Sequence, residues 1–91
     1  MFLYAIFMAA SMAEPLAQQQ PDNPVIQNLL GSVRLAQRRL PEAEAIFKGI
    51  VDKNPDFIPA AFNLVEVLVA SNRLDEAQSM LQNLAQRASD G

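Results

Sequence analysis

From residue 24 onward, apolar side chains recur at three- and four-residue steps, the spacing of one face of an α-helix. Two successive stripes consist of Ile26, Leu29, Leu30, Val33 and Ala36, and then of Ala43, Ile46, Phe47, Ile50 and Val51. No segment of the chain shows the two-residue alternation that is typical of a strand. The pattern therefore predicts an all-α fold.

Local signals mark where these helices begin and end. Asn23 precedes Pro24, a cap residue followed by the imino acid that suits the first helical position. The polar residues 37–39 separate two helices, Pro41 suits the first turn of the second, and Pro55 stops that helix. The same plan recurs further on, and it predicts helices over about residues 59–70 and 75–88.

The recurrence is an internal repeat, because positions 24–57 align with positions 58–91 without a gap. Matched pairs include Leu30 with Leu64, Val33 with Val67, Ala36 with Ala70, Leu40 with Leu74, Glu42 with Glu76 and Ala43 with Ala77, always 34 positions apart. Each unit reads as helix–turn–helix. We expect two such units to stack as a short α-solenoid.

Residues 1–13 form an apolar leader that carries no charge. A helix of that length spans roughly 20 Å, which is short of the ~30 Å hydrocarbon core of a membrane. One interpretation is a secretory signal, with residues 2–10 as its apolar stretch and Ser11 and Ala13 as small residues before a cleavage site. The other is an extra helix that packs on the repeats.

Residues 14–23 are polar, and their composition predicts a linker between the leader and the first repeat. Pro21 lies 34 positions before Pro55, so this segment also resembles the tail of a preceding repeat. Ala9, Ala13 and Leu16 then fall on helix packing positions, whereas Pro15 would remove a backbone hydrogen bond from such a helix. Both interpretations of the leader stay open.

The composition excludes several kinds of catalytic and metal site. Among 91 residues there is no cysteine and no histidine, which excludes disulfides, structural zinc, a thiol nucleophile and an imidazole base. The three glycines are isolated, so no phosphate-binding loop is present. The net charge of −3 argues against a nucleic-acid partner. We therefore expect no enzymatic activity, no catalytic residues, no metal and no cofactor.

Charged side chains gather near the turns between helices. Acidic residues at predicted helix starts, Glu42, Glu44, Asp75 and Glu76, suit the helix dipole. Basic residues Arg34, Arg38, Arg39 and Arg73 lie near the same turns. They either contact an acidic partner or form ordinary solvated turns.

The repeat resembles the tetratricopeptide repeat. Leu30-Gly31 matches the Leu-Gly pair in the middle of that family's first helix, and Ala43, Phe47, Ile50 and Pro55 match its second helix and closing proline in order. The resemblance covers residues 24–57 as one repeat and 58–91 as another. The sequence departs from the family pattern at Val65 and Ser89. It also departs at Arg34 and Leu68, where the family often has an aromatic residue.

The resemblance implies how the helices pack. Gly31 and Ala43 would let two helices approach closely, while Phe47 and Leu81 would fill the space between neighbouring units. Val65 replaces the small residue at the position of Gly31, so it should push its helices slightly apart.

The resemblance also implies a protein-interaction adaptor that binds a peptide or helix on the concave face formed by the first helices. Transferring the register, that groove would expose Val25, Asn28, Ser32, Leu35, Ala36, Phe62, Glu66, Val69 and Ala70. Phe62 would be its main apolar anchor. None of these positions is Lys or Arg, which argues against clamping a terminal carboxylate. For Leu35 and Val69, core packing is the competing explanation.

The partner is thus expected to be a protein or peptide. Self-association is an alternative, in which the chain is part of a longer array or completes its core with another copy, because solenoids usually need about three repeats. A membrane would be involved only if residues 1–13 are retained. Export to the periplasm or exterior follows from a cleaved leader, and a cytoplasmic location from the packed helix.

Overall fold

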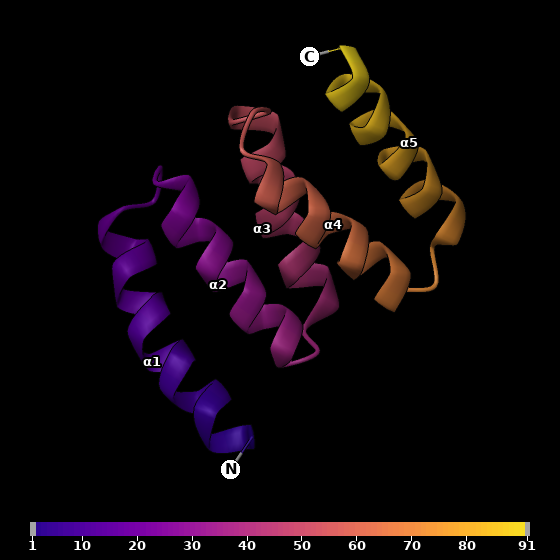
Figure 1. Ribbon diagram of the computed structural model, residues 1–91. Coiled ribbons are helices and arrows are strands. Elements are labelled where there is room, and N and C mark those ends of the chain that lie inside the picture. The colour runs from indigo at the N-terminus through magenta and orange to yellow at the C-terminus, as the bar shows by residue number, and fades with distance from the viewer. Residues whose placement is uncertain (1, 91) are drawn as a thin grey trace.

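A computed structural model describes residues 2–90, with the side chain of Phe2 outside that description. It contains five α-helices, α1 (Phe2–Gln19), α2 (Pro24–Ala36), α3 (Leu40–Lys53), α4 (Ile58–Ala70) and α5 (Leu74–Asp90). Each helix packs on the next in the chain, and α2 also contacts α4 (Figure 1). Successive helices run in roughly opposite directions, so the chain forms a short α-solenoid, which confirms the predicted fold class.

The turns inside the two repeats have the same backbone conformation. Arg38 and Asn72, which occupy equivalent positions of the two repeats, both have a φ of 61°. In each turn this residue's N–H donates to the carbonyl three residues back, and the next N–H donates to the carbonyl five residues back, at 2.8 to 3.0 Å. This pair of bonds is the Schellman motif, which satisfies the last carbonyls of a helix.

The connections between repeats also share one geometry. The N–H of Asn23 donates to Gln20 (3.2 Å), and at the equivalent place in the next connection the N–H of Phe57 donates to Asn54 (2.9 Å). Helix α1 ends at Gln19 and α3 ends at Lys53, which are also equivalent positions in the repeat register. Helix α1 therefore stands in the register of a second helix of a preceding repeat.

The predicted linker over residues 14–23 is mostly wrong. Helix α1 continues to Gln19 with Pro15 inside it, and only residues 20–23 form a connection. Pro15 removes one backbone hydrogen bond, but contacts made by the residues before and after it in the sequence hold the helix. Ala13 and Ala17 are 0% and 6% exposed against α2, and Glu14 Oε2 lies 2.6 Å from Arg34 Nη2.

The start of α2 follows its sequence signal. The side-chain oxygen of Asn23 accepts hydrogen bonds from the N–H groups of Val25 (3.0 Å) and Ile26 (3.4 Å), and Pro24 is the first helical residue. These contacts satisfy two donors that the helix itself leaves without partners. The cap fixes where the first complete repeat begins.

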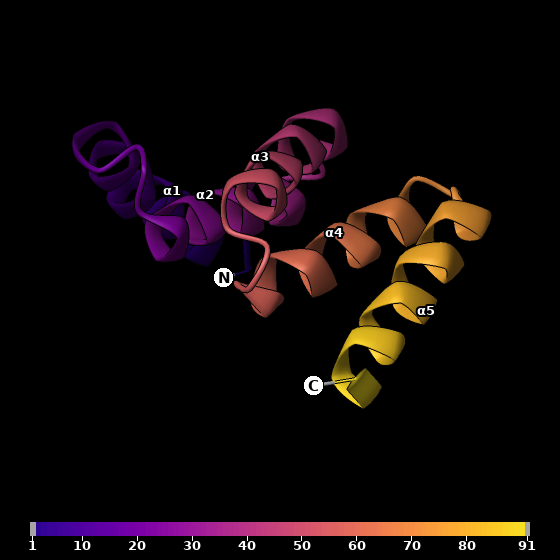
Figure 2. The ribbon, with the colours of Figure 1, turned by 90° about the horizontal axis from the view of Figure 1, so that it is seen from above.

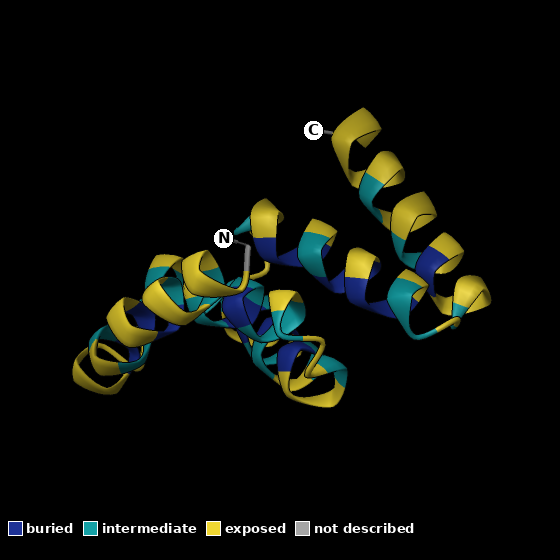
Figure 3. Ribbon diagram, turned by 90° about the horizontal axis from the view of Figure 1, so that it is seen from below, coloured by how far each residue is buried: buried dark blue, intermediate teal, exposed yellow. Residues whose placement is uncertain are grey.

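Most of the buried apolar side chains form one cluster, the main core. Its members are Ala43, Phe47, Ile50, Ala60, Leu64, Val65, Val67, Leu68 and Ala77, from α3, α4 and α5. A smaller cluster of Ala10, Ala13 and Val33 joins α1 to α2. Figure 3 shows that buried positions lie where helices meet, while most of α5 is exposed.

Gly31 and Phe47 account for the close approach of α2 and α3. A Cβ placed on Gly31 would lie 2.5 Å from the Phe47 ring, which is itself fully buried. Only glycine therefore fits opposite this ring without movement, as the resemblance implied. Leu81 does not play the role expected of it, because it is 43% exposed and no helix in the described part of the chain covers it.

Candidate functional site

Helices α2 and α4 are the first helices of the two repeats, and they contact each other (Figure 2). The side-chain nitrogen of Asn63 on α4 donates a 2.9 Å hydrogen bond to the side-chain oxygen of Asn28 on α2. Asn28 is thus partly engaged within the protein. We use the name α2–α4 face for the surface that carries the nine predicted groove residues, which all lie on these two helices.

The predicted groove residues differ in exposure. Val25, Phe62 and Val69 are 60%, 52% and 52% exposed. Ala36 and Glu66 are also exposed. The remaining predicted residues are half-buried, namely Asn28, Ser32, Leu35 and Ala70. Leu35 packs against the main core, the competing explanation for this residue, whereas Val69 is accessible on the surface.

Phe62, Glu66 and Val69 form a continuous exposed stripe on α4. Their spacing of four and then three residues places them on one face of the helix. Two apolar side chains thus flank one carboxylate. Such a stripe suits a ligand that offers two apolar anchors and a basic group or N–H donor between them.

The predicted residues border two separate hollows. Phe62 lines a groove of about 460 Å³ between α4 and α5, the terminal groove, formed by Ile58, Phe62, Leu81, Leu84, Ala85, Arg87 and Ala88. Ser32 and Ala36 line a hollow of about 290 Å³ between α1 and α2, together with Ala5, Ile6, Ala9, Leu29 and Val33. Phe62 therefore lies where the α2–α4 face meets the terminal groove.

The α5 side of the terminal groove was not among the predicted site residues. A signal for it exists in the repeat register, because Leu81 and Ala85 stand 34 positions after Phe47 and Val51. Those two α3 residues belong to the main core or pack against it. The equivalent α5 residues are exposed.

Three of the four arginines near the turns, Arg34, Arg39 and Arg73, have carboxylate partners within the chain. Arg34 pairs with Glu14, Arg39 lies 2.7 Å from Glu42, and Arg73 lies 2.6 Å from Glu44 and 2.8 Å from Glu76. The hydrogen bond from Arg73 holds the pKa of Glu76 below its ordinary value. These pairs connect neighbouring helices and turns, in keeping with a structural role for Arg34, Arg39 and Arg73.

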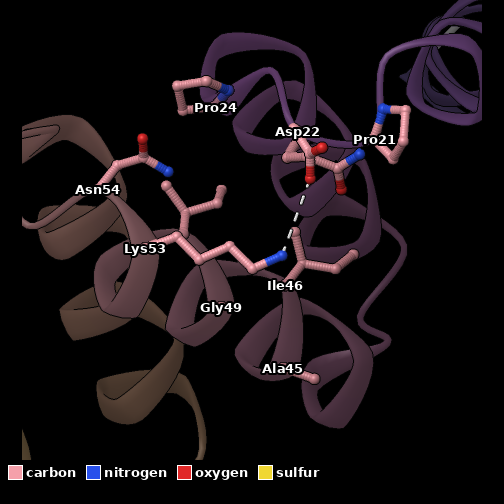
Figure 4. A pocket seen from close by; sticks show the side chains of 10 residues that line it. Pro21, Asp22, Pro24, Ala45, Ile46, Gly49, Lys53 and Asn54 are labelled. Atoms are coloured by element: carbon pink, nitrogen blue, oxygen red, sulfur yellow. Dashed lines mark ion pairs between the residues drawn. The ribbon is translucent and has the colours of Figure 1, made fainter.

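A further cleft of about 200 Å³ lies between the connection at residues 20–23 and α3 (Figure 4). Lys53 and Asp22 face each other across it, with Nζ and Oδ1 3.9 Å apart, and both side chains are largely exposed. A solvated pair of this kind contributes little to stability. The cleft offers no constellation suited to catalysis.

A family model described as tetratricopeptide repeat matches residues 9–61 and again residues 34–90. The chain belongs to the tetratricopeptide repeat family. Tetratricopeptide repeats act in protein–protein interaction and are generally non-catalytic. The first match begins within the predicted leader, at residue 9, and it includes most of α1.

Neither the curated proteins nor the solved structures searched contain a match to this chain. As for membranes, none of the helices within residues 2–90 combines the length and apolar character needed to span a bilayer.

Proposed function

We propose that this tetratricopeptide repeat chain is a non-catalytic adaptor that binds a peptide or helix of a partner protein along the α2–α4 face. The observation that carries the proposal is the exposed stripe of Phe62, Glu66 and Val69. Large apolar side chains that are half-exposed on one helix face supply the anchors that peptide-binding surfaces use.

The charge of this face favours one type of ligand. Glu66 lies between the two apolar anchors, and none of the nine predicted positions carries a cation. A ligand with apolar residues flanking a lysine or arginine would pair its charge with Glu66. A ligand that presents a free carboxylate at the same place would be repelled.

A displayed library of random peptides, selected against the whole chain, provides the probe. The affinity of a selected peptide is then measured by fluorescence anisotropy for the variants Phe62→Ala and Val69→Ala. Each should weaken binding about tenfold or more, because each removes an apolar anchor. Glu66→Lys should weaken most strongly those selected peptides that contain a basic residue.

Leu74→Ala is the matched control, because Leu74 is 55% exposed but lies at the start of α5, apart from the stripe. It should leave the affinity unchanged. Denaturation midpoints of all these variants should stay close to that of the parent, since the side chains are about half exposed. Selected peptides that are insensitive to both Phe62 and Val69, or equal losses of binding and stability in Phe62→Ala, would contradict the proposal.

A further inference from the structure

The two ends of the array each carry a large apolar surface. One is the terminal groove between α4 and α5. The other is the α1 ridge, formed by Leu3, Tyr4, Phe7, Met8 and Met12, which are 44% to 79% exposed. Large contiguous apolar patches on a protein surface mark sites where proteins or membranes bind.

The terminal groove lies where the array geometry packs a helix. In the middle of the chain, Phe47 and Val51 contribute to the core that α3 shares with α4. Leu81 and Ala85 occupy the same register on α5, with only the groove beside them. The interface between α3 and α4 thus shows what kind of object fits there, which is a helix with an apolar face.

The side-chain sizes on the ridge and in the groove favour packing of one against the other. On α1, Leu3 and Phe7 form one row at four-residue spacing, and Tyr4, Met8 and Met12 form the adjacent row. In the groove, the small side chains Ala85 and Ala88 leave a hollow between larger neighbours on α4 and α5. Rows of side chains spaced four residues apart pack into such furrows when two helices meet.

The charges are compatible with burial of both surfaces. Residues 3–13 of α1 carry no charge. Arg87 is the one charged residue that lines the groove, and its guanidinium donates to the carbonyl of Pro55 (3.1 Å) and lies 3.5 Å from Asp56. Among the described side chains, contact between the surfaces would therefore bury no unpaired charge, which is the costly event in apolar association.

The exposed area is sufficient for association. The exposed fractions of its five side chains give the ridge about 600 Å² of accessible surface. If the groove and its borders cover all of it, the contact would bury about 1,200 Å² in total, the lower end of the range for specific interfaces, where association is weak. A pairing of two α1 ridges would bury a similar area but would leave the groove uncovered.

We infer that the α1 ridge of one copy docks into the terminal groove of a second copy, head to tail. This single contact covers both apolar surfaces. Because the two surfaces differ, the contact is heterologous, and a row of copies joined by it keeps a free ridge at one end and a free groove at the other, to which further copies can bind. The inference does not depend on peptide binding at the α2–α4 face, and Val69 lies outside both surfaces involved.

Sedimentation equilibrium of the whole chain, from about 5 µM to about 500 µM, tests this inference. The average mass of the parent should rise with concentration beyond that of a dimer. Phe7→Glu places a carboxylate on the ridge, and Ala85→Glu places one in the groove. Each should weaken association at least about tenfold, so that each variant alone stays largely monomeric.

The decisive sample is an equal mixture of the two variants. The Phe7→Glu chain keeps an intact groove and the Ala85→Glu chain keeps an intact ridge, so the mixture should form a dimer that grows no further. Leu74→Glu is the control, because it places the same charge on an exposed residue outside both surfaces and should associate like the parent. Circular dichroism confirms that every variant is folded; Phe7 and Ala85 are both exposed.

Several results would overturn the inference. A parent that is monomeric at every concentration would do so, as would a mixture that stays monomeric. Association that Phe7→Glu abolishes and Ala85→Glu leaves intact would indicate pairing between two α1 ridges. Binding to phosphatidylcholine vesicles that depends on Phe7, without association in solution, would assign the ridge to a lipid surface.

Discussion

Helices α3 and α5 occupy the same register in successive repeats, yet they are buried to very different extents. Ala43 and Ala77 are equivalent, and both are almost fully buried, at 0% and 3% exposure. Phe47 and Leu81 are also equivalent, but Phe47 is fully buried and Leu81 is 43% exposed. The positions differ because α3 packs against helices on both sides, whereas α5 packs against α4 alone among the helices of residues 2–90.

Helix α1 resembles α5 in having one neighbour, because it packs on α2 and no helix precedes it in the described chain. Ala13, at the register of Phe47, is fully buried, while Met12 beside it is 65% exposed. Burial in this fold therefore depends on which neighbours a helix has as much as on the residue itself. This dependence is what leaves apolar surfaces at both ends of the array.

The largest expected effect concerns the equivalent pair Phe47 and Leu81. Phe47→Ala should lower the free energy of unfolding by about 3–5 kcal/mol, because it leaves a cavity in the main core. Leu81→Ala should cost only about 1 kcal/mol, since the side chain is partly solvated. Urea denaturation followed by circular dichroism, at concentrations where the chain is monomeric, measures both.

If Phe47→Ala proves unfolded, Phe47→Leu provides the comparison, because it introduces the residue that the second repeat carries at this position. Because Phe47→Leu is the smaller change in side-chain volume, a loss of stability below that of Leu81→Ala would remove the distinction between the two helices.

The two helical glycines provide the next comparison. Gly49→Ala should raise the free energy of unfolding by about 0.5–1 kcal/mol, because its Cβ would meet no atom within 4 Å and alanine favours helix. Gly31→Ala has the same intrinsic gain, but its Cβ would collide with the Phe47 ring at 2.5 Å, a cost of about 1–3 kcal/mol. Thermal and urea denaturation should therefore rank Gly49→Ala well above Gly31→Ala. Equal stabilities would argue against close packing of α2 and α3.

A smaller effect is expected at the turns inside the repeats. Arg38 and Asn72 both adopt a left-handed backbone, which costs an ordinary side chain about 1–2 kcal/mol and asparagine less. Arg38→Gly should therefore stabilise the chain by about 1 kcal/mol, and Asn72→Gly by less. Measured midpoints in the reverse order would contradict the Schellman geometry of the first turn.

The smallest expected effect concerns the arginines at these turns. Arg73 bonds to Glu76 in the first turn of α5, which follows it, and to Glu44 on α3, whereas Arg39 donates to Glu42 in the first turn of α3, which follows it. Arg73→Ala should therefore lower the thermal midpoint at neutral pH slightly more than Arg39→Ala does. Equal midpoints would indicate that the bond to Glu44 contributes nothing measurable.

The effect of Arg73→Ala should also depend on pH. The pKa of Glu76 is held below its ordinary value of 4.5 in the folded chain, so its pairing stabilises the fold above that pH. The stabilisation is lost as the pH falls through the lowered pKa. The difference between parent and variant should accordingly be largest near pH 7 and shrink in acid, as thermal melts across that range would show.

The sequence predicted those features that local chemistry determines. The repeat period, the cap at Asn23 and the turns follow from residue type and spacing, and the close packing at Gly31 was implied by the resemblance to the tetratricopeptide repeat. The helix over residues 14–19 was missed because local polarity and Pro15 argue against it, while the contacts with α2 that hold it are not local. Those contacts, such as Glu14 with Arg34, join residues from different helices.

The candidate site was predicted less completely. Three of the predicted positions on α4, Phe62, Glu66 and Val69, are exposed, but the register could not separate Leu35, which packs on the main core, from Val69. The terminal groove was missed because no helix within the described residues covers it, and no sequence motif signals such a hollow. Equivalent residues therefore share a register and still differ in surroundings.

Amide hydrogen exchange on the monomeric chain tests most directly the claim that neighbours determine burial. We predict that amides of α3 are the most protected, and that those of α5 and α1 exchange faster through partial opening at the two ends. The residues to compare are Phe47 and Leu81, which share a register and differ in their cover. Equal protection of these two amides would contradict the claim.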